Sequence, residues 1–360
     1  MSYSLHYSLA GYQPVYCQSD GIILFKGRKL YRANHELGDI RPICALPLQT
    51  AAARLPGRLA ARIFRVGIDA AAPIQDDWLL IAMRDTLYRV SLTTGECHVD
   101  LHIEGGGRVL NLSEIVDPDS GGRTICFGDY VTAFDGRPVR LWRRGTAEHA
   151  EWQVAATFPA GMVDHVHNIV QTPDGAVFVL TGDFGDAAGI WRSNPDLSLL
   201  EPIARGNQGV RACWLWQAPN GEIVFATDSQ FEANHLRRLS GGTAQDLAPI
   251  LGSSIYAYAD ASRVLFSTTV EPGELTGKRL RDIFERQPGP GIMGQDAAIY
   301  AYDGSDLALI HRARKDSWPM RLAQFGTFRF CNGSAPADRF YAYGVAVERD
   351  DGHCLLFKCS

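Results

Sequence analysis

The sequence predicts an all-β protein, a seven-bladed β-propeller. A short triplet recurs seven times along the chain: an aliphatic residue, a bulky residue and, in most copies, a basic one. Its central residues are Tyr31, Tyr88, Trp142, Trp191, Arg237, Tyr300 and Phe357, at spacings of 57, 54, 49, 46, 63 and 57 residues. A period near 50 that fills the chain is typical of a propeller, whose repeating unit is a four-stranded blade. Segments rich in β-branched and aromatic residues, bounded by turns, support this prediction. We assign the triplet to the third strand of each blade.

The triplets divide residues 1–360 into blades within a single domain. The expected blades are approximately 14–48, 63–103, 108–158, 163–205, 209–249, 253–312 and 320–360. The last triplet lies two residues before the end of the sequence, so the seventh blade lacks an outer strand of its own. We expect a segment within Ser2–Tyr16 to supply that strand, close the ring and cover an otherwise open sheet edge.

Two hairpins fix the register of the fourth and fifth blades. Asp174-Gly175 and Asn220-Gly221 lie 46 residues apart. Such dipeptides favour type I′ turns, in which both central residues have positive φ. The predicted inner hairpins are therefore 165–171 with 176–183 in blade four, and 211–217 with 222–228 in blade five. Val264–Thr269 is the matching second strand of blade six.

Blade six carries an insertion between its second and third strands, Val270–Ala298. Within it, Glu274–Gln287 places Leu280, Ile283 and Phe284 on one helical face, and the run of proline and glycine that follows ends the helix. A short surface helix is expected here. Because it leaves from the rim that also carries the polar residues described below, it is a candidate lid as well as a simple surface addition.

Composition excludes several classes of partner. The formal charge is −5 and there is no long basic run, which argues against nucleic acid or an anionic membrane. No apolar stretch is long enough to predict a membrane-spanning helix, and Met1–Tyr12 lacks the pattern of a secretory signal. The eight cysteines are scattered, without a zinc-binding spacing, and are expected to be reduced thiols of a cytoplasmic protein.

Polar residues are expected to converge on the rim of blades four to six. In propellers, the loops that join blades and the loops that join second to third strands share one rim, a geometry taken here by analogy with the fold. The residues expected there are Asp164, His165, His167, Asp183, Gln208, Arg211, Asp228 and Glu271.

His165 and His167 form a pair at the spacing that places both imidazoles on one face of a strand. Two such imidazoles could share a divalent metal, the one cofactor that the sequence suggests, with Asp183 or Asp228 as a third ligand. They could equally act in acid–base chemistry or hydrogen bond to a substrate, or be structural histidines satisfied by their neighbours.

The other rim residues are candidates for catalysis or substrate binding. Asp183 and Asp228 could be the paired carboxylates of a glycosidase, or could cap turns. Arg211 stands where the preceding blade has His165, so it either binds substrate or bridges two blades. Gln208 and Glu271 are expected to bind substrate. Trp214 could stack on a sugar ring, although packing between blades is the commoner role of such aromatics.

The chain resembles uncharacterised propellers of the sialidase/BNR-like group associated with bacterial polysaccharide metabolism. A degenerate Asp-box, Ile190–Asp196, and a longer pattern across residues 163–345 carry this resemblance. The pattern comprises His165-x-His167, Thr181-Gly182-Asp183, Gly206-x-Gln208-x-x-Arg211, Ala226-Thr227-Asp228-Ser229, Glu271-Pro272 and Lys315-Asp316-x-Trp318-Pro319. It implies a carbohydrate ligand, an oligosaccharide or polysaccharide, without naming a reaction.

Three functions follow from these residues. A uronate lyase needs a base, an acid and a clamp for the substrate carboxylate, which His165, His167, Arg211 and Gln208 could provide. A glycoside hydrolase needs two carboxylates, drawn from Asp183, Asp228 and Glu271. The third function is a non-catalytic propeller that binds glycan or protein in polysaccharide assembly. The sugar, the linkage and the oligomeric state stay open.

Overall fold

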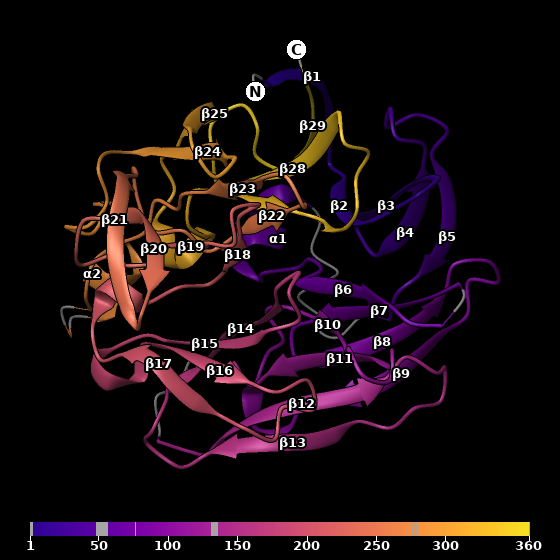
Figure 1. The fold of residues 1–360 in the computed structure, drawn as a ribbon. Helices are drawn as coiled ribbons and strands as arrows, with labels where there is room; N and C mark the ends of the chain where they lie inside the picture. Colours follow the sequence, from indigo (N-terminus) through magenta and orange to yellow (C-terminus); the bar gives the residue numbers. More distant parts are fainter. Residues whose placement is uncertain are drawn as a thin grey trace. The chain divides into compact units, whose positions relative to one another are not determined.

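The computed structural model describes residues 3–47, 57–75, 77–130, 136–275, 277 and 279–359. Their strands form seven sheets, six of four strands and one of five, and the fold is a seven-bladed β-propeller, as predicted (Figure 1). The chain divides into two compact units. Unit 1 comprises Met1–Gly67, Asp228–His235 and Ala248–Ser360, and unit 2 comprises Ile68–Thr227 and Leu236–Leu247. No helix among the described residues is long and apolar enough to cross a membrane.

Unit 2 contains blades two to five, in which neighbouring strands follow sequence order. Blade two is β6 (Ala70–Pro73), β7 (Trp78–Met83), β8 (Thr86–Ser91) and β9 (Cys97–His102). Blade three is β10 (Ser113–Val116), β11 (Arg123–Gly128), β12 (Val139–Gly145) and β13 (Gln153–Phe158). Blade four is β14 (His165–Gln171), β15 (Val177–Gly182), β16 (Gly189–Ser193) and β17 (Glu201–Arg205). Blade five is β18 (Trp216–Gln217), β19 (Ile223–Ala226), β20 (His235–Ser240) and β21 (Thr243–Pro249).

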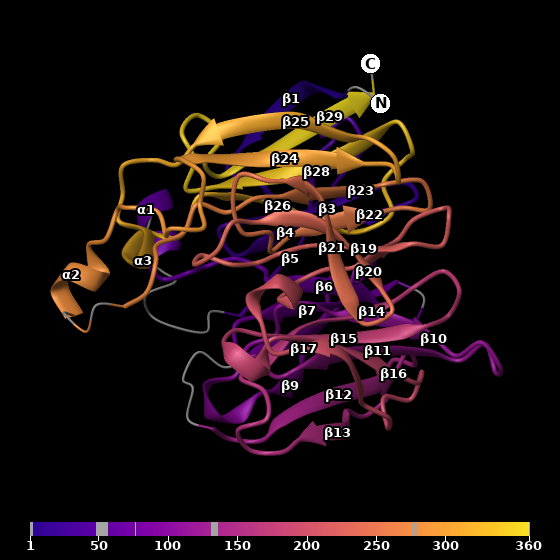
Figure 2. The same cartoon turned by 60° about the vertical axis from the view of Figure 1, so that its left-hand side comes forward.

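Unit 1 contains the other three blades. Blade one is β2 (Gln13–Gln18), β3 (Gly21–Lys26), β4 (Lys29–Ala33) and β5 (Arg41–Ala45), with β27 (Asn332–Gly333) parallel to β2. Blade six is β22 (Ala257–Ala259), β23 (Val264–Ser267), β24 (Asp296–Tyr302) and β25 (Leu307–Arg314). Blade seven is β26 (Thr327–Phe330), β28 (Arg339–Val345), β29 (His353–Cys359) and β1 (Tyr3–Ala10). Helix α3 (Met320–Ala323) contacts both α1 (Arg58–Ile63) and α2 (Arg279–Ile283) (Figure 2).

The N-terminal strand completes blade seven, as the sequence predicts. β1 pairs antiparallel with β29, and Tyr3 lies opposite Cys359. The Tyr3 ring packs edge-on against Phe340 with centroids 5.1 Å apart, and Phe340 stacks on Phe357 at 4.7 Å. The pairing and these aromatic contacts bury what would otherwise be an open edge of β29.

Each sequence triplet lies on the third strand of a blade, and a β-bulge lies opposite it in six of the described blades. In blade one, Leu30 pairs with Cys44 and Tyr31 with Pro42, so the outer strand carries one extra residue between them. The same shift occurs at the triplets of blades two, three, four, six and seven. A bulge at this position bends the outer strand and increases its twist.

The two inner hairpins differ from their predicted turn type. Gly175 and Gly221 have φ of 87° and 84°, whereas Asp174 and Asn220 are not among the residues with positive φ. In blade four, Thr172 N–H donates to the Ala176 carbonyl and Gly175 N–H to the Thr172 carbonyl. The expected type I′ turns are therefore wrong, and each loop is one residue longer, with a glycine in the left-handed region.

The inner strand of blade five is also shorter than predicted. Only Trp216–Gln217 forms a continuous ladder with β19, and an isolated bridge joins Ala212 to Thr227. Between these two points the chain leaves the ladder, although Trp214 and Trp216 are each only 4% exposed. The predicted strand 211–217 is therefore only partly formed.

Gly221→Ala is expected to lower the free energy of unfolding by about 1 kcal/mol, because an alanine at positive φ is strained while its Cβ meets no atom within 4 Å. Gly145→Ala is the matched control, since φ is not positive there and the nearest atom would lie at 3.6 Å. Urea denaturation of both variants measures the difference. Equal stabilities of the two would contradict the assigned turn.

The insertion in blade six contains a helix, but a much shorter one than Glu274–Gln287. Helix α2 spans only Arg279–Ile283, and residues 276 and 278 lie outside the described residues. Leu280 and Phe284 are 74% and 56% exposed. Two of the three residues of the expected apolar face therefore remain exposed, and five residues make barely more than one helical turn.

Candidate functional site

One carboxylate in unit 2 gathers three of the predicted site residues around it. Oδ1 of Asp183, just after β15, lies 3.3 Å from Nε2 of His165, 3.0 Å from Nε2 of His167 and 2.9 Å from Nη2 of Arg211. The histidines come from β14, and Arg211 from the loop that enters blade five. We call these four residues the Asp183 cluster. Sequence reasoning predicted their proximity.

A bulge in β14 brings the two imidazoles together. Val166 pairs with Thr181 and Asn168 with Leu180, so His167 is the extra residue of the ladder. Its ring centroid lies 4.9 Å from that of His165. Bulges redirect side chains in this way, and they occur often next to functional sites.

Two neighbours fix the ring of His167. Its Nδ1 lies 2.9 Å from the Ala212 carbonyl oxygen. A carbonyl only accepts hydrogen bonds, so Nδ1 carries a proton and Nε2 is turned towards Asp183. The other constraint is Gly182, where a Cβ would lie 2.2 Å from Cε1 of His167. Only glycine leaves room for the imidazole at this distance.

Polar groups also hold the backbone at Asp183. Asp164 Oδ2 accepts hydrogen bonds from the N–H groups of Asp183 and Phe184, at 3.0 and 3.3 Å. Gln208 donates through Nε2 to the Asp183 carbonyl oxygen at 2.7 Å, and Arg211 donates to Gln208 Oε1 at 3.4 Å. Asp164 and Gln208, both predicted rim residues, thus support the cluster rather than enter it.

The charges around Asp183 keep it ionised. Burial alone would raise the pKa of Asp183, but the guanidinium of Arg211 and the two imidazoles hold it well below its ordinary value of 3.8. Asp183 is therefore a carboxylate at neutral pH and has no proton to donate.

The cluster is closed on most sides. The side chains of His165, His167 and Arg211 are 1%, 3% and 6% exposed, and that of Asp183 is 14% exposed. The ring of Tyr130, from blade three, covers His165 with centroids 4.2 Å apart. Any ligand of this site would reach it past Asp183 or after movement of a neighbouring side chain.

The donor set fits a divalent metal. His165, His167 and Asp183 each offer one ligand atom, and these atoms lie within 4.8 Å of one another. Imidazole nitrogen with carboxylate oxygen suits zinc or manganese. The hydrogen bond from Nδ1 of His167 to a carbonyl is the arrangement that orients a ligating histidine. The guanidinium of Arg211 would repel a bound metal ion, because it already binds the same oxygen of Asp183.

The remaining predicted residues are Trp214, Asp228 and Glu271. Trp214 lies in unit 2 but is 4% exposed, so its ring offers little surface to a sugar. Asp228 and Glu271 belong to unit 1, where they are 3% and 6% exposed. Glu271 accepts a hydrogen bond from the Ser253 hydroxyl.

Sequence reasoning missed Tyr130, which contacts His165. A signal was present: Gly128-Asp129-Tyr130 ends the second strand of blade three as Gly182-Asp183-Phe184 ends that of blade four. The carbonyl oxygen of Asp129 accepts a hydrogen bond from Val166 N–H at 3.0 Å, which places Tyr130 beside His165. This repeated Gly-Asp-aromatic sequence could have been used to predict that Tyr130 lies beside His165.

No known protein family matches the chain, and no curated protein matches it in sequence. Among solved structures, it is similar to an oligogalacturonate lyase in complex with manganese, with 12% identity, coverage of 98% of this chain and 90% of that one, and a TM-score of 0.53. The AfRom2 CNH domain is similar over 100% and 99%, with 7% identity and a TM-score of 0.55.

A third similar structure is a puromycin hydrolase mutant in complex with PGG, with 14% identity and a TM-score of 0.50. This chain is covered over 92% and spans about half, 52%, of that protein. At these identities the likenesses show the propeller fold alone. The expected link to sialidase/BNR-like propellers finds no support in a matching family.

Proposed function

We propose that this protein cleaves an acidic oligosaccharide by β-elimination at the Asp183 cluster, with a divalent metal held by His165, His167 and Asp183. The observation that carries the proposal is the convergence of two imidazole nitrogens on one carboxylate oxygen, with His167 fixed through Nδ1. The manganese-containing oligogalacturonate lyase of the same fold supports the choice of reaction as an analogy.

The chemistry of a uronate lyase assigns roles to these residues. A proton must leave the carbon next to the sugar carboxylate, and that carboxylate must be neutralised. We assign the carboxylate contact to Arg211, whose guanidinium suits a two-point bond, and proton removal to a base other than His165, since the basic nitrogen of His165 would hold the metal. A bound metal would withdraw charge from the same carboxylate. Tyr130, packed on His165, is the candidate for protonating the leaving oxygen.

The state of Asp183 favours elimination over hydrolysis. A glycosidase needs one carboxylic acid with a raised pKa to protonate the leaving group. The pKa of Asp183 is shifted in the opposite direction, since Arg211 and the histidines outweigh the effect of burial. Asp183 therefore suits a metal ligand or an orienting carboxylate better than a general acid.

The burial of the cluster favours one alternative. His165 and His167 expose 1% and 3% of their side chains, so the cluster could instead join blades four and five of a propeller that binds glycan without cleaving it. In that case no metal is needed, because Arg211 already balances the charge of Asp183.

Metal analysis of the purified protein after dialysis against Mn²⁺ tests the proposal. We expect about one bound ion per chain, and its loss in His167→Ala, because removal of one of three protein ligands weakens such a site strongly. His149→Ala is the matched control, as the His149 side chain is 79% exposed and lies outside the cluster.

Incubation with acidic oligosaccharides then separates the reactions. Ultraviolet absorbance of an unsaturated uronate, abolished by His165→Ala and His167→Ala, is the expected result. New reducing ends without this absorbance would contradict elimination and support hydrolysis. Glycan binding with neither metal nor product would support the non-catalytic alternative.

A further inference from the structure

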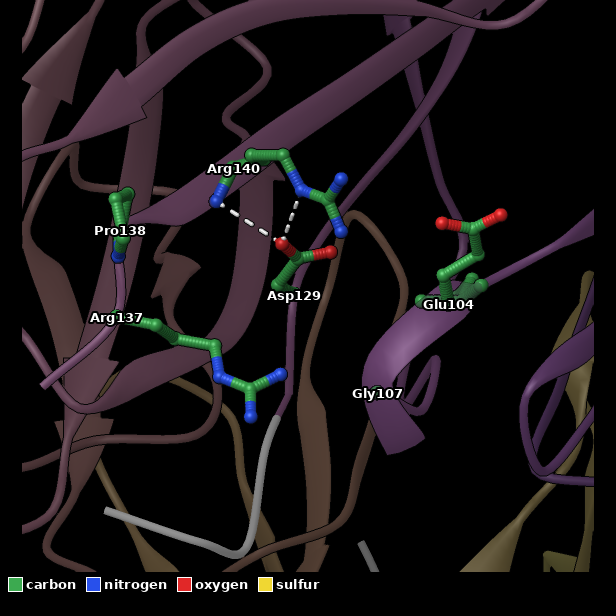
Figure 3. A pocket seen from close by; sticks show the side chains of 7 residues that line it. Glu104, Gly107, Asp129, Arg137, Pro138 and Arg140 are labelled. Atoms are coloured by element: carbon green, nitrogen blue, oxygen red, sulfur yellow. Dashed lines mark hydrogen bonds and ion pairs between the residues drawn. The ribbon is translucent and has the colours of Figure 1, made fainter. Parts of the chain in front are cut away.

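Three of the eight cysteines meet in the core of unit 1, although they are scattered along the sequence. Cys17, Cys331 and Cys354 are free thiols of one buried cluster, and they are 1%, 6% and 0% exposed. The charged side chains that line a hollow in unit 2 differ from them, because Asp129 and Arg140 there already form an ion pair at 2.7 Å (Figure 3). The three thiols are thus a group of reactive side chains outside the Asp183 cluster.

The backbone holds the segment of Cys331 against β2, the strand of Cys17. β27 pairs in parallel with β2, and Cys17 lies opposite Gly333. A Cβ on Gly333 would lie 2.2 Å from the Cys17 carbonyl oxygen, so this close approach requires glycine. Cys331 is the single residue between β26 and β27. The chain therefore passes from the inner strand of blade seven to the inner strand of blade one at these two cysteines.

The side chains of Cys17 and Cys331 are in contact as well. Their thiols share a hydrogen bond, and this bond, together with burial, raises the pKa of Cys331 well above its ordinary value of 9.0. Cys354, on β29, is the third thiol, and burial and Cys17 raise its pKa in the same direction. A disulfide needs its sulfur atoms at about 2.05 Å, so a small approach of two side chains that already touch would be enough to form one.

We propose that Cys17 and Cys331 form a reversible disulfide, with a peroxide as the oxidant, which joins blade one covalently to blade seven and stabilises the fold. The sulfur of Cys331, the more exposed of the two, attacks the O–O bond and becomes a sulfenic acid, with release of one water. The thiol of Cys17 then displaces the second water and closes the S–S bond. The two thiols together lose two hydrogen atoms, and one hydrogen peroxide becomes two water molecules. Neither step involves the metal or the reaction proposed for the Asp183 cluster.

The surroundings of Cys331 determine how fast the bond forms and what it does. Only the thiolate attacks, and the raised pKa of Cys331 keeps its thiolate fraction small at neutral pH. The reaction should therefore be slow at neutral pH and faster as the pH rises. Once formed, the bond should stabilise the fold strongly, because the two cysteines lie near opposite ends of the sequence and closure of a long loop removes much entropy from the unfolded chain.

Peptide mapping of the full chain, first reduced and then treated with hydrogen peroxide at neutral and at mildly alkaline pH, tests the proposal. Trypsin places Cys17, Cys331 and Cys354 on separate peptides, which are 1–26, 330–339 and 350–358. We expect the first peptide linked to the second, sooner at the alkaline pH, and release of both by dithiothreitol. Cys331→Ser should lose the link. Cys126→Ser is the control and should keep it, because Cys126 is also buried but lies on β11 of blade three.

Thermal unfolding of the same samples measures the effect on stability. Oxidation should raise the unfolding temperature of the wild type and of Cys126→Ser by about 5 °C or more, and should not change that of Cys331→Ser. Each oxidised sample is compared with the reduced sample of the same variant. A loss of stability caused by the serine itself therefore does not affect the result.

Three outcomes would overturn the proposal. The first is a peroxide-treated wild type in which peptides 1–26 and 330–339 stay unlinked. The second is a link between 1–26 and 350–358, which would make Cys354 the partner of Cys17. The third is a Cys17–Cys331 link that leaves the unfolding temperature unchanged, since a bond that joins blade one to blade seven must restrict the unfolded chain.

Discussion

Arg211→Ala is expected to lower the free energy of unfolding at neutral pH by about 3–5 kcal/mol, because it leaves the largely buried carboxylate of Asp183 without its strongest cationic partner. Denaturant titration of the purified variant measures the loss. Arg192→Ala, at an exposed position of blade four, is the control and is expected to change stability by less than about 0.5 kcal/mol. A loss of similar size in both variants would show that Arg211 does not stabilise Asp183.

The pH dependence of stability provides a second measurement of the same contact. The folded-state pKa of Asp183 lies below its ordinary value of 3.8, so ionised Asp183 stabilises the fold above that pH. This contribution is lost as the pH falls from 3.8 towards the folded-state pKa. The wild type should therefore lose stability in this range, and Arg211→Ala should show a shallower loss. Parallel curves for the two proteins would contradict the assigned shift.

Gly182→Ala is expected to destabilise the protein by about 1–3 kcal/mol, because its Cβ would lie 2.2 Å from Cε1 of His167 and force that ring to move. The same movement should break the hydrogen bond from Nδ1 to the Ala212 carbonyl and abolish metal binding. Thermal or urea denaturation measures the first effect, and metal analysis measures the second.

The control for this substitution is again Gly145→Ala, in which the new Cβ meets only Ala150 at 3.6 Å. The control is expected to unfold like the wild type and to keep its metal. If Gly182→Ala bound metal as tightly as Gly145→Ala, the ring of His167 would not be the ligand that we propose.

The blades could be predicted from the sequence because the triplets and turn dipeptides that mark them are short, local features. The triplets lie on third strands, and the N-terminal segment that was predicted to complete the last blade is β1, the partner of β29. Polar residues at the ends of equivalent strands could also be matched from one blade to the next. That is why Asp164, His165, Asp183 and Arg211 were expected together, and the structure places these four in one unit.

The rest depended on contacts that periodicity does not encode. The bulge at His167 and the need for a glycine at position 182 both depend on how β14 packs against β15. Tyr130 belongs to another blade, more than thirty residues from His165 in sequence. The helix in the insertion was overestimated because three apolar residues at helical spacing do not show what they pack against, and Leu280 packs against little.

The pairing of β1 with β29 has a consequence for the order of folding. Residues 3–10 meet residues 353–359, so this ladder joins the most distant segments of the fold. Contacts of such long sequence separation form slowly, since the entropy of closing the loop must be overcome first. During synthesis, β1 leaves the ribosome long before its partner exists. Blade seven is therefore expected to be the last blade completed, and β1 is the segment most in need of protection from premature pairing with other chains.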